Sequence, residues 1–293
     1  MDTGKVSGVV VTFHPDADVL ENLAALCQQL RHVVVVDNGS NAAEAGALRA
    51  ASERVGFELI ENGANLGIAT GLNVGVRRAQ AAGADYVLLF DQDSQVTPHF
   101  AEAMLACFVE IAATRKLGVL VPTYVDKRLG NAMESIFEHD GQMETAMTSG
   151  SMVRMETLAT HGLFMDELFI DGVDHEFSLR LRAAGYTLEE CRQAVLLHSP
   201  GSPTVHTLPW RAKPFHVANY PPIRRYYQER NKILLIRRYW REFGPFCVRQ
   251  LHSGLKDLGK ILLFETNKLV KLGHFFLGTW HGLMGRSGKM PGS

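Results

Sequence analysis

Short apolar runs rich in β-branched residues alternate with stretches of helical periodicity over most of this chain. Five of these runs predict strands, at Val6–Thr12, Val33–Val36, Phe57–Ile60, Tyr86–Phe90 and Leu117–Val121. Leucines at helical spacing follow the first run, and further helices are expected at Leu72–Ala82 and His99–Thr114. Strands and helices that alternate at this pace predict an α/β fold with a mostly parallel, doubly wound sheet. Ligands of such sheets bind at the carboxyl ends of the strands.

The second half of the chain is less regular. The expected elements are loops with a short hairpin at Tyr124–Thr148, a helix at Val173–Ala184, and short strands at Tyr186–Cys191 and Val195–Leu197. Six prolines between Pro200 and Pro222 indicate a boundary or a mobile loop, beyond which the chain is basic and helical. We therefore expect an α/β domain over residues 1–205 and a basic helical extension over residues 206–293.

The composition is that of an ordinary globular protein, with 46% hydrophobic and 21% charged residues among 293. The four cysteines form no CxxC pair, the first residues lack a signal-peptide pattern, and no apolar stretch reaches 18 residues. These features predict a reduced, cytoplasmic protein without a cysteine metal site or a spanning helix. Charge is uneven, because residues 224–293 carry 14 Lys and Arg against 4 Asp and Glu. The two parts of the chain are therefore expected to face different partners.

Polar clusters follow several of the predicted strands. Asp91 and Asp93 lie two residues apart, and such carboxylates can share a divalent cation, Mg²⁺ or Mn²⁺, or simply form an acidic loop. The sequence DNGS at 37–40 offers an Asp and an Asn to the polar edge of a base such as uracil or thymine, although Asn-Gly is also a common turn. The glycines of NLGIATGLNVG would let backbone approach a ligand, but helix packing alone would also explain Gly71 and Gly75.

Two residues of the second half are candidates for chemistry. Asp174 lies where a predicted helix begins, with Phe177 and Leu181 on the core side, so its carboxylate could act as a general base on a hydroxyl or cap the helix. His198 ends a short apolar strand, where an imidazole is either a satisfied structural group or a third ligand beside carboxylates.

Seven motifs occur in one order along the chain. They are VVTFHPD, VVVVDNGS, NLGIATGLNVGV, LLFDQDS, TSGSMVRMETLATHGLFMDELFIDGVDHEFSLRLR, LLHSPGS and RRYYQERN. In this order the sequence resembles the inverting GT-A glycosyltransferases of family 2, and among them the bacterial dTDP-L-rhamnose rhamnosyltransferases of O-antigen, capsule and rhamnolipid synthesis. The resemblance runs from Val6 to about Arg286. It implies a Rossmann-like GT-A fold, a nucleotide-sugar donor and a glycan or glycolipid acceptor.

The resemblance also implies which residues hold the donor. The base would be held by Thr12, His14, Asp37 and Asn38, and the ribose and diphosphate by Asn65, Gly67 and Asn73. Arg230 and Asn231 match a late RN motif, where a cation would meet the diphosphate.

The metal and the base follow from the same resemblance. Asp91 and Asp93 would form the DxD motif beside the donor, with Asp93 the direct ligand of the cation and His198 completing the coordination. Asp174 matches the acceptor-activating Asp of the family's ED motif, although Val173 stands where the family has Glu. The cation would offset the charge of the leaving diphosphate, and one displacement would invert the anomeric centre.

The basic tail contains a row of leucines at helical spacing, Leu251, Leu255, Leu258 and Leu262. Among and after them stand Lys256, Lys260, Lys268, Lys271, Phe275, Phe276 and Trp280. The row would either pack on the domain or lie on an anionic membrane, which would place the protein peripherally on the inner face of the cell membrane.

Two other functions are weighed against glycosyl transfer. A metal-dependent nucleotidyltransferase acting on a sugar phosphate would need a basic, glycine-rich triphosphate loop, which TFHPDAD lacks. A nucleic-acid-binding protein built on residues 224–293 would leave the DxD, Asp174 and His198 without a purpose. We therefore expect no nucleic acid partner.

Overall fold

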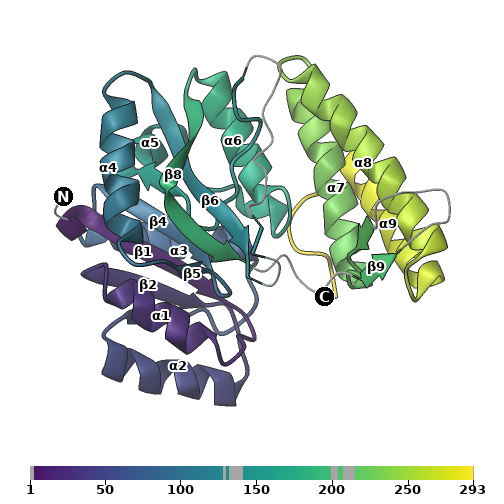
Figure 1. The fold of residues 1–293 in the computed structure, drawn as a ribbon. Helices are drawn as coiled ribbons and strands as arrows, with labels where there is room; N and C mark the ends of the chain where they lie inside the picture. The colour runs from purple at the N-terminus through teal and green to yellow at the C-terminus, as the bar shows by residue number, and fades with distance from the viewer. Residues whose placement is uncertain (1–2, 128–129, 132–140, 199–203, 207–214, 293) are drawn as a thin grey trace. The chain divides into compact units, whose positions relative to one another are not determined.

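The computed structural model describes residues 3–127, 130–131, 141–198, 204–206 and 215–292. Its contacts divide the chain into two compact units, which we describe one at a time (Figure 1). The first unit holds residues 1–166 and 173–199, and the second holds residues 167–172 and 200–293. The division near residue 200 lies close to the expected one at 205, whereas no sequence pattern predicts that residues 167–172 belong to the second unit.

The first unit is built on an eight-stranded sheet in the described part of the chain. Its strands are β1 (Val6–Thr12), β2 (His32–Asp37), β3 (Glu58–Glu61), β4 (Tyr86–Asp91), β5 (Gln95–Val96), β6 (Leu117–Asp126), β7 (Met152–Arg154) and β8 (Thr187–His198). Their order is β3-β2-β1-β4-β7-β6-β8-β5. The pairs among β1 to β4 and the pair β6–β8 are parallel, whereas β7 and β5 run antiparallel to their neighbours. The prediction of a mostly parallel α/β sheet is confirmed.

Helices lie on both faces of this sheet. They are α1 (Val19–Cys27), α2 (Ala42–Val55), α3 (Ile68–Ala81), α4 (Phe100–Ala112), α5 (Met155–His161) and α6 (Val173–Ala183), with a 3₁₀ turn at Thr3–Lys5. A second 3₁₀ turn, Asp166–Leu168, begins in the first unit and ends in the second. A Cβ added at Gly75 would lie 2.3 Å from Val9 Cγ1, so α3 packs on the β1 face that carries Val9. A Cβ at Gly8, on the opposite face, would meet Leu30 just beyond α1. The sheet is therefore doubly wound.

Two predicted elements differ from the structure. The two short strands expected near residues 186–197 are one strand, β8, because a register shift opposite Pro122 and Thr123 absorbs the irregularity between them. Strand β6 continues to Asp126, so the expected loop region starts later than predicted. The hairpin expected in that region falls largely on residues 128–129 and 132–140, which lie outside the described residues.

The second unit contains a two-stranded antiparallel ribbon and three long helices. The elements are β9 (Thr204–His206), β10 (Phe215–Val217), α7 (Pro222–Tyr239), α8 (Gly244–Leu263) and α9 (Lys268–Leu283). Proline at the first position of α7 favours the start of that helix, because its missing N–H needs no partner there. A Cβ at Gly278 would lie 2.4 Å from the Tyr226 carbonyl oxygen, so glycine allows α9 to approach the backbone of α7.

Three of the four leucines in the tail's row face outward. Leu251, Leu255 and Leu262 are 44%, 68% and 48% exposed, whereas Cys247, Gly254 and Ile261 on the adjoining side of α8 are buried. Helix α9 also exposes apolar residues at helical spacing, which are Leu269, Phe276, Trp280 and Leu283. Both helices therefore carry a buried face and a second apolar face that the described residues leave open. None of the described helices is long and apolar enough to cross a membrane.

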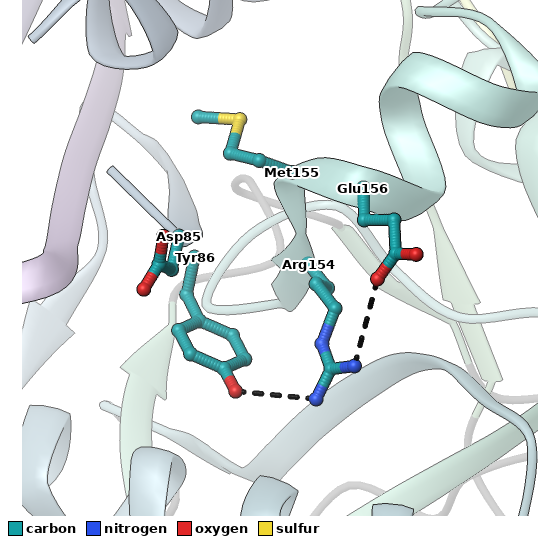
Figure 2. A pocket seen from close by; sticks show the side chains of 5 residues that line it. All are labelled: Asp85, Tyr86, Arg154, Met155 and Glu156. Carbon is teal, nitrogen blue, oxygen red and sulfur yellow. Dashed lines mark hydrogen bonds and ion pairs between the residues drawn. The ribbon is translucent and has the colours of Figure 1, made fainter. Parts of the chain in front are cut away.

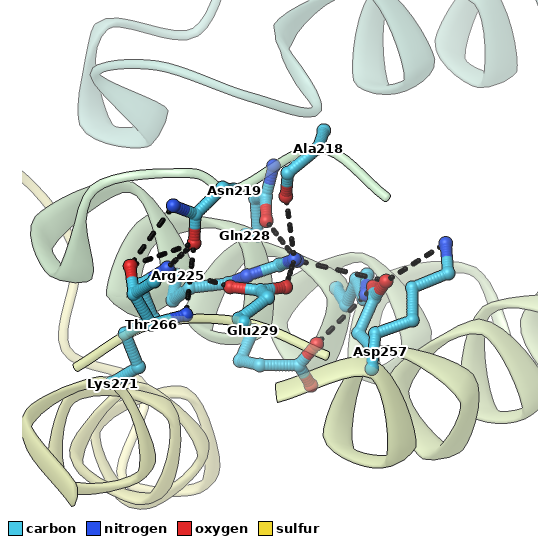
Figure 3. Close-up of polar contacts among 11 residues, drawn as sticks. Ala218, Asn219, Arg225, Gln228, Glu229, Asp257, Thr266 and Lys271 are labelled. Carbon is cyan, nitrogen blue, oxygen red and sulfur yellow. Dashed lines mark hydrogen bonds and ion pairs between the residues drawn. The ribbon is translucent and has the colours of Figure 1, made fainter. Parts of the chain in front are cut away.

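A buried ionic network joins the three helices of the second unit (Figure 3). Arg225 pairs with Glu265, and Lys271 Nζ lies 2.8 Å from the other oxygen of that carboxylate. Lys232 Nζ lies 2.7 Å from Glu229 and 2.6 Å from Asp257. Three of the four carboxylates of residues 224–293 are thus directed inward, which leaves the outer surface of this stretch mainly to cations.

Candidate functional site

Polar side chains from three neighbouring strands meet at the carboxyl edge of the sheet. Thr12 at the end of β1 is in register with Asp37 at the end of β2, and Val11 is in register with Asp91 at the end of β4. Because β1, β2 and β4 are parallel, these strand ends point to the same edge. The structure therefore places Thr12, Asp37 and Asp91 together, as the strand pattern predicted.

Asp37 holds the turn that follows β2. Its carboxylate accepts hydrogen bonds from Thr12 Oγ1 at 3.2 Å, from Gly39 N at 3.2 Å and from Ser40 N at 3.0 Å. The turn needs glycine at position 39, because φ is +92° and an added Cβ would lie 2.6 Å from the Ala64 backbone. Asp37 is 2% exposed, so it shapes the site mainly through this turn.

Asn38 connects the same turn to the loop before α3. Its amide nitrogen donates to Asn65 Oδ1 at 3.2 Å and to the Gly67 carbonyl at 3.1 Å. Its oxygen accepts from Asn62 Nδ2 at 3.1 Å and from Leu66 N at 3.2 Å. Asn38, Asn65 and Gly67, which are predicted to bind the nucleotide-sugar, are thus brought together where two loops are hydrogen-bonded to each other.

Asn73 is turned to a different loop. Its amide nitrogen donates to the Phe164 carbonyl and to Asp166 Oδ1, both at 2.8 Å, and its oxygen accepts from Phe164 N at 2.9 Å. The side chain is 1% exposed. These contacts hold residues 164–166, whereas contact with a diphosphate stays a prediction.

His14 lies at the exposed side of the turn. Its φ is +46°, its N–H donates to Ser40 Oγ at 3.0 Å, and its Nδ1 lies 2.7 Å from Glu44 Oε2. The neighbouring Phe13 is 41% exposed. An exposed imidazole and an exposed ring beside a buried polar turn form a surface on which a flat base could stack.

The DxD residues lie where β4 meets the loop to β5. The Asp93 carboxylate is half exposed and its Oδ1 lies 3.8 Å from Nδ1 of His198, the last residue of β8. His198 Nδ1 is buried and has no hydrogen-bond partner. Among the described residues, no three His, Cys, Asp or Glu side chains gather closely enough to form a complete metal site. The structure therefore brings Asp93 and His198 close together, but protein side chains alone do not complete a metal site there.

Ser149 is a residue of this site that the sequence did not single out. Its hydroxyl accepts from Asp91 N at 3.3 Å and is hydrogen-bonded to the Ser94 hydroxyl, and its carbonyl accepts from the Tyr124 hydroxyl at 2.8 Å. Gln92 holds the other side of the DxD, because its Oε1 accepts from Phe13 N at 2.8 Å. Lys127 Nζ donates to the Asp93 carbonyl at 3.1 Å. Only the small-residue stretch TSGS could have signalled a part of this support.

Asp174 is the second residue of α6. Its Oδ1 accepts from the adjacent His175 N at 2.8 Å, and Phe177 and Leu181 of the same helix are buried, as predicted. The position before it is the buried Val173, so no acidic helper precedes this carboxylate. A carboxylate in the first turn of a helix is also stabilised by the helix dipole.

Tyr124 connects Asp174 with the DxD. It is buried on β6, and its pKa is raised well above the ordinary value, first by burial and then by the nearby charges of Asp91, Asp174 and Glu190. The charges of Asp91 and Asp174, which are 83 positions apart in sequence, thus both act on the pKa of Tyr124. Tyr124 and Asp91 are also joined through Ser149, which accepts a hydrogen bond from each of them.

Arg230 and Asn231 lie in the second unit, on α7. Both are 1% exposed. Arg230 donates to the carbonyls of Gly288, Glu167 and Leu168, and Asn231 Nδ2 lies within 2.9 Å of the carbonyls of Leu168, Ile170 and Asp171. None of these hydrogen bonds joins them to the other residues that are predicted to bind the nucleotide-sugar. Their contact with a diphosphate stays a prediction, and the observed bonds favour a different role.

A shallow pocket of about 270 Å³ opens elsewhere on the first unit (Figure 2). It is lined by Asp85, Tyr86, Arg154, Met155 and Glu156. Tyr86 begins β4, at the end of that strand away from Asp91. The pocket therefore lies at the amino edge of the sheet and is separate from the cluster of polar residues.

Comparison with known proteins finds a family that the first half of the chain matches. Residues 7–142 match the model of glycosyl transferase family 2. The chain contains a family 2 glycosyltransferase domain. This glycosyltransferase is 29% identical, over 97% of both chains, to the dTDP-rhamnosyl transferase RfbF of Shigella flexneri.

Solved structures confirm the GT-A fold. The mannosyltransferase PcManGT from Pyrobaculum calidifontis, in complex with GDP-Man and Mn²⁺, is similar with a TM-score of 0.57 and 16% identity, over 98% of this chain and 76% of that chain. S. aureus TarS is similar with a TM-score of 0.50 and 16% identity over 79% of this chain, which spans 40% of the TarS chain. The family match and the match to the dTDP-rhamnosyl transferase favour sugar transfer over the nucleotidyltransferase and nucleic-acid-binding alternatives.

Proposed function

We propose that this glycosyltransferase moves L-rhamnose from dTDP-L-rhamnose to a hydroxyl of a glycan or glycolipid. The alignment with a dTDP-rhamnosyl transferase over 97% of both chains supports the donor. The observation that carries the chemistry is the group of Thr12, Asp37 and Asp91 at the carboxyl edge of the sheet, with Asp93 Oδ1 3.8 Å from His198 Nδ1. Inverting transfer needs a cation for the leaving diphosphate and a base for the acceptor; we assign the first to the DxD with His198 and the second to Asp174.

The donor would lie along the strand ends. Its base would meet the surface of Phe13 and His14 above the turn that Asp37 holds. Its ribose and diphosphate would follow the loop of Asn65 and Gly67, which Asn38 fixes in place, toward Asp91. Thr12, Asp37 and Asn38 would then act by shaping the pocket, since their polar atoms already bond within the protein.

A divalent cation, Mg²⁺ or Mn²⁺, fits the residues at the DxD. His198 Nδ1 is a buried nitrogen with no hydrogen-bond partner, 3.8 Å from Asp93 Oδ1, and a cation would satisfy both groups. Asp91 would be the second carboxylate, and oxygens of the donor diphosphate would supply further ligands. When bound, the cation would offset the charge that develops on the leaving diphosphate.

Asp174 would accept the proton of the acceptor hydroxyl. The hydroxyl oxygen would attack the anomeric carbon from the side opposite the diphosphate, so a single displacement inverts that centre. No second carboxylate is needed as a nucleophile in this reaction.

We propose that the acceptor is carried on a lipid. The protein would then bind peripherally to the inner face of the cell membrane. Exposed apolar residues run along α8 and α9, including Leu255, Leu262, Phe276 and Trp280. Three of the four carboxylates of residues 224–293 are turned into the ionic network, so cations dominate the outer surface. An apolar face flanked by cations is suited to an anionic lipid surface.

A donor panel tests this function. The full-length protein would be incubated with dTDP-L-rhamnose, UDP-sugars and GDP-sugars, each with Mn²⁺, with Mg²⁺ or with EDTA, and release of the nucleoside diphosphate would be measured. We expect release from dTDP-L-rhamnose only with a divalent cation, and faster with a lipid-linked glycan acceptor. Equal release from the other donors would contradict the rhamnose assignment, and full activity in EDTA would contradict the metal.

A further inference from the structure

The segment just before Asp174 has an unusual backbone. Phe169, Asp171 and Gly172 have φ values of +65°, +63° and +80°. Side chains other than glycine rarely adopt this left-handed conformation, because the Cβ then crowds the following carbonyl. Such conformations persist only where surrounding contacts enforce them, and they concentrate at functional sites.

Helix α7 supplies those contacts through Asn231. The Nδ2 of Asn231 lies 2.9 Å from the Leu168 carbonyl, 2.8 Å from that of Ile170 and 2.7 Å from that of Asp171. A single buried amide thus serves three successive parts of the turn. A Cβ added at Gly172 would lie 3.6 Å from Asn231 Cβ, so the turn is also packed closely against this residue.

Three neighbours of Asn231 reinforce the same turn. Arg230 Nη2 donates to the Leu168 carbonyl at 2.9 Å, and the ring of Phe169 stacks on Tyr227 with centroids 4.9 Å apart. Arg224 pairs with the Asp171 carboxylate, with a shortest distance of 3.1 Å. All of these residues lie on α7 of the second unit. The turn they hold leads through Gly172 directly into Val173, the first residue of α6.

We propose that Asn231 is a positioning residue that acts on Asp174 through the turn Phe169–Gly172. By fixing the left-handed backbone of this turn, it sets where α6 begins and how the Asp174 carboxylate is presented to the acceptor. Asn231 and its α7 neighbours would then serve the reaction without touching the donor. This inference rests on the proposed role of Asp174 as the base.

The substitution Asn231→Ala tests the proposal in steady-state kinetics of the full-length protein. It removes the two N–H groups of the side-chain amide that donate hydrogen bonds to the turn. We therefore expect kcat to fall about 10- to 100-fold, as when a catalytic group is displaced by about 1 Å. The KM for dTDP-L-rhamnose and the affinity for dTDP, measured by calorimetry, should stay within about 3-fold of the parent. If the donor KM rises instead while kcat is kept, Asn231 contacts the donor and the proposal is overturned.

Two further variants separate positioning from stability. Ile261→Ala removes a buried side chain of α8 in the same unit that donates no hydrogen bond to the turn. Its kcat should match the parent at a temperature where the protein is folded, and an equal loss of kcat would show that general loosening causes the effect. Arg224→Gln breaks the half-exposed pair with Asp171 and the contact of the guanidinium with the Tyr220 ring, and it leaves the buried bonds of Asn231 in place, so it should fold even if Asn231→Ala does not. It should lower kcat in the same direction by about 3-fold or more, and an unchanged kcat would overturn the proposal.

Asp174→Asn, measured in parallel, keeps this inference distinct from the proposed function. A large loss with Asp174→Asn and none with Asn231→Ala would overturn the positioning role alone. Normal turnover with Asp174→Asn would show that the proposed base itself is wrong.

Discussion

The outward leucines of α8 allow a substitution that separates membrane contact from folding. The double substitution Leu255→Ser and Leu262→Ser removes two side chains that are 68% and 48% exposed. Surface changes of this kind alter the free energy of unfolding by little, about 0.5 kcal/mol each. The same two leucines would be among the groups that insert into a lipid surface.

The size of the effect on membrane binding follows from these exposed fractions. Complete burial of a leucine side chain contributes about 1.5–3 kcal/mol, so the exposed part of Leu255 could contribute about 1–2 kcal/mol and that of Leu262 about 1 kcal/mol. Their sum, about 2–3 kcal/mol, corresponds to a 30- to 150-fold weaker partition to vesicles. The matched control Ile261→Ala lies on the buried side of α8, where truncation should lower the free energy of unfolding by about 2–5 kcal/mol and leave vesicle binding of the folded protein unchanged.

Co-sedimentation with phosphatidylglycerol vesicles at low and high salt, together with denaturant titration, measures both quantities. We expect the double leucine variant to lose vesicle binding and keep its unfolding midpoint, and Ile261→Ala to show the reverse. Unchanged vesicle binding of the double variant, or a loss of stability as large as that of Ile261→Ala, would refute the assignment of this face to the membrane. Absence of parent binding at low salt would point to a soluble acceptor.

Three further substitutions test single features of the first unit. Gly75→Ala should lower the free energy of unfolding in denaturant by about 1–3 kcal/mol, because the new Cβ would lie 2.3 Å from Val9 Cγ1; an unchanged midpoint would contradict the close packing of α3 on β1. Glu58→Gln should lower thermal stability at pH 7 by less than about 1 kcal/mol. Arg78 lowers the pKa of Glu58 below its ordinary value of 4.5. The ion pair therefore stabilises the folded protein above pH 4.5, and this stabilisation is lost as the pH falls and Glu58 becomes protonated. If Glu58→Gln lowered the stability at pH 3 as much as at pH 7, this account would be contradicted. Asp93→Ala should remove the response of turnover to added Mn²⁺ without changing the unfolding midpoint, and turnover that still rises with Mn²⁺ would argue against the DxD as the metal site.

The sheet could be predicted because its strands are apolar on both faces. The run Val6–Thr12 is fully buried in β1, and the strand predicted there has the same bounds in the structure. Since parallel strands end at one edge, the same pattern predicted that Asp37 and Asp91 lie at the same edge of the sheet, where β1 separates their two strands. The capping box of Asn41 and Glu44 at the start of α2 was not predicted, although an Asn followed three residues later by a Glu is its usual pattern.

Other features depend on contacts that the sequence does not encode locally. The buried amides of Asn73 and Asn231 bond to carbonyls 91 and 60 to 63 positions away, and an asparagine in a helical stretch gives no sign of such partners. The tail shows a row of leucines, yet α8 buries the side that adjoins this row. Glycine at position 254 makes that packing possible, because a Cβ there would lie 3.1 Å from the Glu229 carboxylate.

The most direct test of the central claim is a proton NMR spectrum of the rhamnoside formed from dTDP-L-rhamnose and a glycan acceptor with the diamagnetic cation Mg²⁺. It reports the configuration of the anomeric carbon after transfer, which is fixed in a glycoside, and the rate of its formation, for the parent and for Asp174→Asn. We predict an inverted centre for the parent, and a rate about 10²- to 10⁴-fold lower for Asp174→Asn with dTDP affinity kept. Retained configuration, or equal rates for the two proteins, would contradict a single displacement in which Asp174 is the base.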